Sequence, residues 1–295
     1  MANYAEIVSQ ITEQHLNNNG VLLGQCLTAV GWVGGTIPKL PNHPNIIELP
    51  TSDSSNSGIV CGFALAGKRP IYVIRYQGFL WYNAVSLFNY AAKSMELWNT
   101  PCPVFIRAIG MEGGIGPVAG GMLHSLAMHI PGLTVCAPIT PEEWSTTWNY
   151  FIEHNVPVFC SEHRRSFSIP QGNFKFGVNT FNDHATLSVV CIGAARLNAA
   201  ELLEQREDFN LIHLYKLKPL SINYLMNIIN TKKVLIIDSD YTICGASEHI
   251  AYELIKRGLN CRIAGLKDQT AGFNKQYDIL TPSTEEIGKL IDECV

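Results

Sequence analysis

Four stretches of this 295-residue chain combine side chains that could act on a small molecule. Residues 52–58 place Asp53 where a predicted strand ends and a predicted helix begins. Ligands of open α/β sheets bind at that edge, although a helix cap or an Asx turn explains the same residues. Residues 76–83 are rich in aromatic side chains and follow another strand, so they could stack on a flat heterocycle or simply pack in a core or interface.

The other two stretches are adjacent to each other. Residues 113–121 are rich in glycine, but their spacing is not Gly-x-Gly-x-x-Gly and no Walker lysine follows. We therefore expect a loop that covers a cofactor or lines a channel, not a nucleotide-binding loop. His124 follows this loop and either points into a cavity or is a structural histidine. The sequence has no Gly-x-Ser-x-Gly elbow, so a Ser-His-Asp triad is not indicated.

The composition excludes several classes of protein. Charged residues make up 16% of the chain, against a usual value of about 25%, which indicates either a surface covered by a partner or a large α/β core. A net charge of −4 argues against nucleic acid, and no apolar run reaches the roughly 18 residues of a membrane span. Nine cysteines without a Cys-x-x-Cys pair favour a reducing, cytoplasmic location and argue against zinc.

Apolar patterns and turn residues predict alternating strands and helices. Strands are expected at residues 21–23, 45–50, 70–76, 103–107, 133–138, 157–160, 187–192, 210–214 and 234–237. Helices are expected at 4–18, 57–67, 83–97, 197–206 and 245–258, with a further one starting at 140. This alternation indicates an α/β fold with mostly parallel strands and helices on both faces. Periodicity disappears near 166–185, so we expect domains at 1–170 and 186–295 joined by a linker at 171–185.

Taken in order, these motifs resemble the beta subunit of the 2-oxoacid dehydrogenases (pyruvate and branched-chain type), within the transketolase-like thiamine-diphosphate family. Residues 49–53 resemble the family's Thr-Pro-Ile-Ser-Glu, and residues 57–70 resemble its Ala-Gly-Ile-Ala-x-Gly-x-Ala-x-Ala-Gly-x-Arg-Pro. Residues 89–93 match Asn-Ser-Ala-Ala-Lys, and residues 131–135 match Pro-Gly-Leu-Lys-Val. His124-Ser125 sits like the family's Gln-His-Ser. The resemblance covers nearly the whole chain and is weaker at its start and in its second domain.

The resemblance implies a pyrimidine-binding domain followed by a transketolase C-terminal-type α/β domain. It also implies thiamine diphosphate as cofactor. The family's Gly-Asp-Gly motif for the diphosphate and Mg²⁺ is absent here, so it would lie on an alpha subunit, with no metal ligand on this chain. An α2β2 assembly is expected, with a small-molecule substrate and a lipoyl acyltransferase as a further candidate partner.

The resemblance also assigns roles to individual residues. Asp53 stands at the position of the family's Glu, whose carboxyl group protonates N1′ of the aminopyrimidine, so it would be both catalytic and cofactor-binding. His124 would be the second catalytic residue, moving protons or holding the acyl carrier. Phe79 or Tyr76 would stack on the pyrimidine, and Gln77 is a further cofactor-binding candidate.

Two departures from the family pattern keep alternatives open. Asp is one methylene shorter than Glu, and Gly24-Gln25-Cys26 replaces a Gly-Glu-Asp that carries a second carboxylate. The leading hypothesis is a subunit of an enzyme that decarboxylates a 2-oxo acid and transfers the acyl or aldehyde unit. The alternatives are the C-terminal subunit of a split transketolase and a non-catalytic, beta-like scaffold for an alpha chain.

Overall fold

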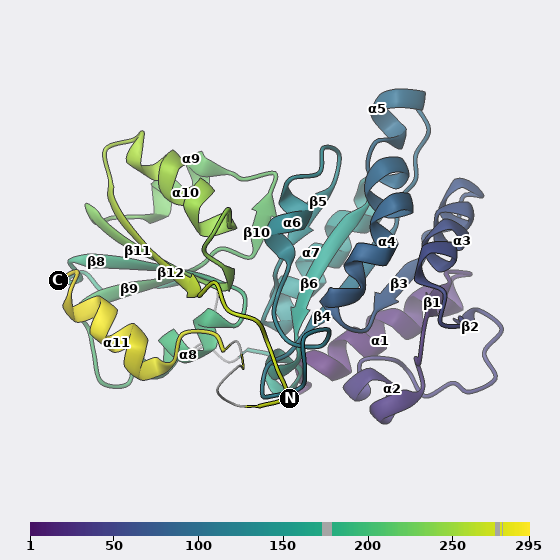
Figure 1. The fold of residues 1–295 in the computed structure, drawn as a ribbon, viewed down its shortest axis with the longest axis horizontal. Coiled ribbons are helices and arrows are strands. Elements are labelled where there is room, and N and C mark those ends of the chain that lie inside the picture. Colours follow the sequence, from purple (N-terminus) through teal and green to yellow (C-terminus); the bar gives the residue numbers. More distant parts are fainter. Residues whose placement is uncertain (173–178, 275–277, 279) are drawn as a thin grey trace.

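A computed structural model describes residues 1–172, 179–274, 278 and 280–295, and it contains two sheets side by side (Figure 1). The first sheet has seven strands in the order β10-β5-β6-β4-β3-β1-β2, and all neighbours are parallel except β10 and β5. Its strands are β1 (Leu22–Gly24), β2 (Ile46–Glu48), β3 (Ile71–Ile74), β4 (Phe105–Gly110), β5 (Thr134–Cys136), β6 (Val158–His163) and β10 (Lys216–Lys218).

Helices cover both faces of the first sheet. On one face, α1 (Tyr4–Asn17) and α7 (Pro141–Glu153) pack their apolar residues on the strands, and a capping box starts each helix. The other face carries α3 (Asp53–Leu65), α4 (Leu80–Ser86), a π-helical turn (Leu87–Ala91), α5 (Ser94–Trp98) and α6 (His124–Met128). The short α2 (Ala29–Gly35) contains left-handed backbone angles from Val30 to Gly34.

The second sheet has five strands in the order β12-β11-β8-β9-β7. Its strands are β7 (Asn179–Thr180), β8 (Leu187–Ile192), β9 (Phe209–His213), β11 (Lys233–Tyr241) and β12 (Asn260–Leu266), and only β7 is antiparallel to its neighbour. Apolar residues of α8 (Ala195–Leu202) and α11 (Thr284–Asp292) pack on one face. Those of α9 (Ile222–Ile228) and α10 (Ala246–Ile255) pack on the other.

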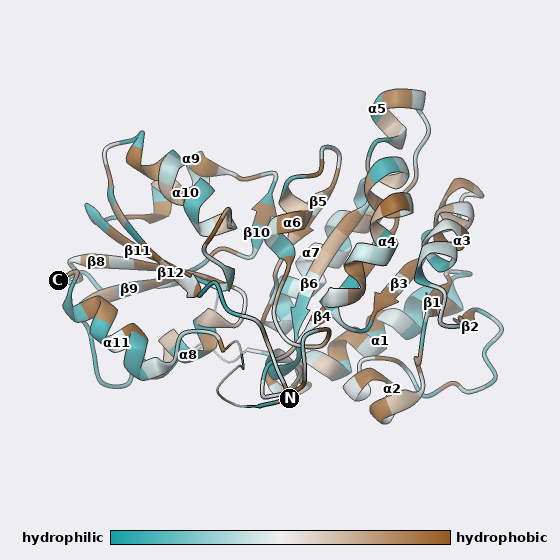
Figure 2. Ribbon diagram, viewed as in Figure 1, coloured by the Kyte–Doolittle hydropathy of each residue, from teal (hydrophilic) through white to brown (hydrophobic). Residues whose placement is uncertain are grey.

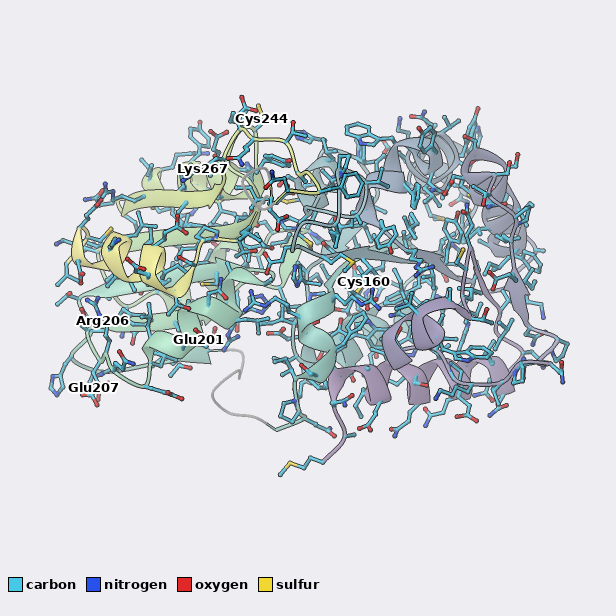
Figure 3. The ribbon with its side chains drawn as sticks, turned by 60° about the horizontal axis from the view of Figure 1, so that its bottom comes forward. Cys160, Glu201, Arg206, Glu207, Cys244 and Lys267 are labelled. Carbon is cyan, nitrogen blue, oxygen red and sulfur yellow. The ribbon has the colours of Figure 1, made fainter. Side chains whose placement is uncertain are left out.

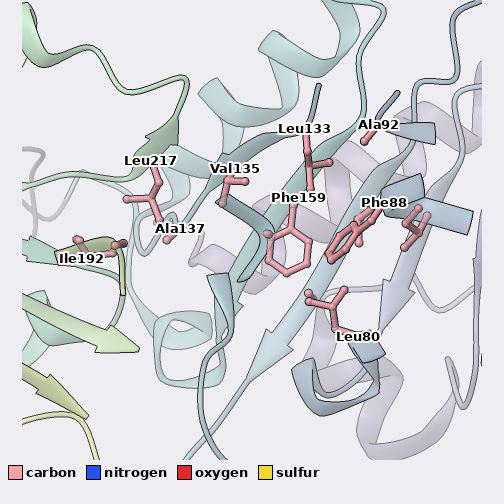
Figure 4. Packing of buried hydrophobic residues seen from close by; sticks show 14 of the residues in the cluster. Leu80, Phe88, Ala92, Leu133, Val135, Ala137, Phe159, Ile192 and Leu217 are labelled. Atoms are coloured by element: carbon pink, nitrogen blue, oxygen red, sulfur yellow. The ribbon is translucent and has the colours of Figure 1, made fainter. Parts of the chain in front are cut away.

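The two sheets share a core, and the second half of the chain contributes one strand to the first sheet. One continuous apolar cluster runs from Leu80 and Phe88 through Phe159 to Leu217 and Ile192 (Figure 4). Strand β10 lies beyond the second half's β9 in the sequence but pairs antiparallel with β5 of the first sheet. The two halves are therefore interlocked through the backbone as well as through side chains.

These findings confirm the expected α/β class with mostly parallel strands. The helix expected at 57–67 begins earlier, at Asp53, so this carboxylate lies in a helix's first turn. The helix expected at 83–97 is interrupted by the π-helical turn and divided into shorter pieces. The division into domains at 1–170 and 186–295 stays a prediction: β7 falls in the expected linker 171–185, of which residues 173–178 lie outside the described part.

The structure also shows where the cysteines and the exposed hydrophobic residues lie. All nine cysteines are free; Cys160 lies inside the first sheet, whereas Cys244 lies at the surface (Figure 3). Hydrophobic residues also recur on the outward helices α4 and α5 (Figure 2). Among the helices of the described residues, none has the length and apolar character needed to span a membrane.

Candidate functional site

A pocket of about 200 Å³ opens at the carboxyl ends of β1, β2 and β3. Asp53 lines it from the first turn of α3, and Tyr76 and Phe79 line it from the segment that follows β3. This is the edge at which ligands of parallel α/β sheets bind, because the connections to the following helices diverge there. The structure thus brings together a carboxylate and two aromatic rings that were singled out from separate stretches of sequence.

The aromatic pair forms one wall of this pocket. The ring centroids of Tyr76 and Phe79 are 6.0 Å apart and tilted by 38°. The guanidinium of Arg75 lies 5.5 Å from the centre of the Tyr76 ring and also lines the pocket. Rings held in this way offer a flat heterocycle a face on which to stack.

The pocket also contains a polar atom that has no partner within the described residues. Gln25 lines the pocket, and its Nε2 atom is buried without a hydrogen bond. Buried donors are nearly always paired, and an unpaired one at a pocket wall marks a place for a ligand acceptor. A carboxylate, two rings and a free amide donor fit an aminopyrimidine, which offers ring nitrogens and a flat face.

Gln77 lies behind this pocket and does not line it. Its side chain is fully buried; Nε2 donates to Ser161 Oγ at 2.8 Å and to Ala108 O at 3.1 Å, and Oε1 accepts from Leu123 N at 2.6 Å. The amide therefore links the strand ends to the start of α6. In this arrangement Gln77 supports the site from behind.

His124 lies apart from the pocket, at the junction of the two halves. Its imidazole is fully buried, and Nε2 is 2.9 Å from Asp238 Oδ1 and 3.8 Å from Asp240 Oδ2, both on β11. On the other side, Nδ1 is 3.4 Å from Ser161 Oγ, which also accepts from Gln77. A buried series of polar contacts, through Ser161 and His124, thus connects the back of the pocket with the second sheet.

The charges in this cluster explain the state of His124. Burial favours a neutral imidazole, but the carboxylates of Asp238 and Asp240 outweigh it and raise the pKa of His124 to about 9. Burial also raises the pKa of Asp240, as does its neighbour Asp238. At neutral pH the imidazole is therefore a buried cation that holds the two halves together.

The glycine-rich loop lies against the aromatic segment. A Cβ atom on Gly78 would come within 2.5 Å of Val118 O, so only glycine allows this close approach. Further along, Gly116 N donates to Gly272 O at 3.1 Å. The loop thus packs between the pocket's aromatic segment and the second half.

Several residues of these sites were not found from the sequence. Asn83 donates a hydrogen bond to Asp53 and accepts one from Tyr72. Asp238 and Asp240 face the imidazole of His124. The only local signal for the acidic pair was the Asp-Ser-Asp at the end of an apolar strand. Among the described residues, no three His, Cys, Asp or Glu side chains gather as a metal site would require.

Comparison with known proteins identifies the family to which this fold belongs. The family model for the transketolase pyrimidine binding domain matches residues 15–169. The beta subunit of acetoin:2,6-dichlorophenolindophenol oxidoreductase from Cupriavidus necator is 27% identical over 237 residues, covering 75% of this chain and 70% of that protein. The beta subunit of the pyruvate dehydrogenase E1 component from Staphylococcus epidermidis is 24% identical over 272 residues, covering 82% and 81%.

A solved structure extends the likeness to the whole fold. A split-gene transketolase, described as an inactive beta4 tetramer, superposes with a TM-score of 0.71 over 99% of this chain and 96% of its own, at 15% identity. The resemblance to 2-oxoacid dehydrogenase beta subunits is confirmed by the sequence relatives, and the fold by this structure. The chain belongs to the transketolase pyrimidine-binding-domain family.

Proposed function

We propose that this chain is the beta-type subunit of a two-chain thiamine-diphosphate enzyme that decarboxylates a 2-oxo acid and transfers the acyl or aldehyde unit. One observation carries the proposal: Asp53, Tyr76 and Phe79 line a single pocket at the strand ends, inside the region that matches the pyrimidine-binding domain. The relatives that are named as beta subunits support the same reading.

In this proposal each pocket residue has a defined task. Asp53 holds or donates a proton at the ring nitrogen N1′, and Phe79 and Tyr76 fix the plane of the aminopyrimidine. Gln77 positions the aromatic segment from behind. When bound, thiamine diphosphate supplies a carbon nucleophile that the twenty amino acids lack.

The proposed role of His124 requires a rearrangement. Its imidazole is fully buried against Asp238 in the isolated chain, so it reaches a substrate only if this contact opens in the assembled enzyme. We propose that binding of the alpha chain opens it. Modification of His124 by diethyl pyrocarbonate, followed by peptide mapping, tests this: protection in the single chain and reaction in the assembly is expected, and equal protection in both contradicts the role.

The alpha chain is the second component of the proposal. The Gly-Asp-Gly motif is absent from this sequence, so the diphosphate and Mg²⁺ are assigned to the partner. The outward faces of α3, α4, the π-helical turn and α5 support a partner-covered surface, because their large apolar side chains are at least 40% exposed: Ile59, Leu65, Trp81, Tyr82, Val85, Tyr90, Met95, Leu97 and Trp98. We propose an α2β2 assembly in the cytoplasm, consistent with nine unpaired cysteines, and a lipoyl acyltransferase as a candidate acceptor.

Calorimetric titration tests the proposal directly. Thiamine diphosphate with Mg²⁺ is titrated into the chain alone, into its alpha chain alone and into the mixture. Binding that appears only in the mixture is expected, because the site is divided between the chains. Absence of binding in all three contradicts the proposal and favours a scaffold.

A donor screen then separates the enzymatic alternatives. The reconstituted pair is supplied with 2-oxo acids or with ketose phosphates, and release of CO₂ is compared with transfer of a two-carbon unit. Turnover of 2-oxo acids is expected. Turnover of ketose phosphates alone would favour the split transketolase, whose fold is shared over nearly the whole chain.

A further inference from the structure

The buried side chain of Asn83 connects the two residues that the proposed function assigns to the pyrimidine ring. Asn83 lies on α4 and is fully buried. Its Nδ2 atom donates to Asp53 Oδ1 at 3.0 Å and to the backbone oxygen of Phe79 at 2.9 Å. One amide group therefore ties the carboxylate to the backbone of the stacking ring.

The neighbours of this amide fix its orientation. Both groups beside Nδ2 are acceptors, so the NH₂ group must face them and the carbonyl oxygen must face the other way. There, the hydroxyl of Tyr72 lies 2.7 Å from Asn83 Oδ1. Burial, and the nearby charge of Asp53, raise the pKa of Tyr72, so its hydroxyl keeps the proton and donates. The result is a series of hydrogen bonds in which Tyr72 donates to Asn83 and Asn83 donates to Asp53.

This series of hydrogen bonds determines which carboxylate oxygen of Asp53 can reach a ligand. Within the described part of the structure, Oδ1 of Asp53 takes the hydrogen bond from Asn83, and Oδ2 is left for the pocket. A side chain shorter than Glu reaches a ring nitrogen only if its position is closely controlled, because hydrogen bonds weaken steeply beyond about 3.2 Å. A buried amide that is bonded at both ends provides such control.

We propose that Asn83 is a positioning residue. Supported by Tyr72, it holds Asp53 and Phe79 in fixed relation so that Oδ2 meets ring nitrogen N1′ of a stacked aminopyrimidine. The inference rests on the proposed function and adds to it the device that allows Asp to act where the family has Glu.

The test compares two ligands that differ in one ring atom. Thiamine diphosphate and its 1′-deaza analogue, in which CH replaces N1′, are titrated with Mg²⁺ into the assembly of the full chain and its alpha chain. Both ligands stack alike, but only the first has the ring nitrogen that can share a proton with the Asp53 carboxylate. We expect wild type to prefer thiamine diphosphate, and Asn83→Leu to reduce that preference at least tenfold, the scale of a hydrogen bond to a charged group.

Matched variants separate positioning from general damage. Asn198→Leu removes another buried asparagine, which lies in the second half, accepts from Arg165 and donates to Pro282 O, and should leave the preference unchanged. Tyr72→Phe removes a single oxygen and should reduce the preference in the same direction but less, which keeps the test available if Asn83→Leu fails to fold.

The possible outcomes distinguish the two proposals. If the wild-type assembly binds neither ligand, the proposed function is wrong. If wild type prefers thiamine diphosphate and both Asn83→Leu and Tyr72→Phe keep the full preference, the positioning role is overturned while the function stands. Equal weakening of both ligands in Asn83→Leu also overturns it, because that result describes a structural role only.

Discussion

Replacing His124 with glutamine removes the cation that faces the buried carboxylates of Asp238 and Asp240. The pKa of His124 is raised from 6.5 to about 9, so the folded chain holds this proton more tightly than the unfolded chain does. At about 1.4 kcal/mol per pKa unit, the proton stabilises the folded state by about 3 kcal/mol. Because the folded pKa is the higher one, this stabilisation is fully present below pH 6.5 and is lost as the pH rises through about 9.

Urea unfolding followed by circular dichroism measures this contribution. Between pH 6.5 and 9.5 the free energy of unfolding of the wild type should fall by about 3 kcal/mol more than that of His124→Gln. At pH 6.5 the variant itself should be less stable by roughly 3–5 kcal/mol, because two buried carboxylates lose their partner.

An exposed histidine supplies the control for this experiment. His249→Gln, on the surface of α10, should follow the wild type across the whole range. Parallel losses of stability in wild type and His124→Gln between pH 6.5 and 9.5 would refute this role of His124. Such a result would mean that the imidazole is not a buried cation at neutral pH.

Four further substitutions test the pocket, the loop and the core. Asp53→Ala should weaken thiamine diphosphate binding to the assembly at least tenfold and abolish turnover, whereas unchanged activity would favour the scaffold alternative. Phe79→Ala should weaken binding about tenfold through lost stacking, measured by the same calorimetry; an unchanged affinity would exclude this ring from the site. Gly78→Val should displace the loop at Val118 and speed amide hydrogen exchange across residues 113–121, and unchanged exchange would contradict the close approach. Trp144→Ala removes a fully buried ring stacked on Trp148 and should cost about 3–5 kcal/mol in urea unfolding; a loss below about 1 kcal/mol would show that the core collapses around the gap.

The pocket could be predicted in outline because its parts follow strand ends. The carboxyl ends of parallel strands share one edge, so assigning both strands placed Asp53 after β2 and Phe79 after β3 at the same edge of the sheet. Their closeness also depends on the strand order β3-β1-β2, which the sequence does not reveal. Gln77 shows the limit of that reasoning. It stands between the two aromatic residues in the sequence, but the turn after β3 directs its side chain inward, where it binds Ser161.

Long-range contacts escaped prediction because no local pattern encodes them. His124 and Asp238 are separated by 114 positions, and a single histidine after a glycine loop gives no hint of its partner. Asn83 lies at the start of a helix expected from periodicity, where a polar residue is ordinarily assigned to the solvent face. Strand β10 has only three residues, with lysine at both ends. Such a strand is too short to show an alternating apolar pattern.

The origin of β10 has a consequence for how the chain reaches its folded state. A chain made from its N-terminus has produced six strands of the first sheet by residue 163, but the edge of β5 stays open until residues 216–218 emerge. An open strand edge can pair with another chain, so the nascent protein passes through a stage that is prone to aggregation. Expressing residues 1–170 alone would prolong that stage indefinitely, and supplying the remaining residues as a separate fragment could close the edge again.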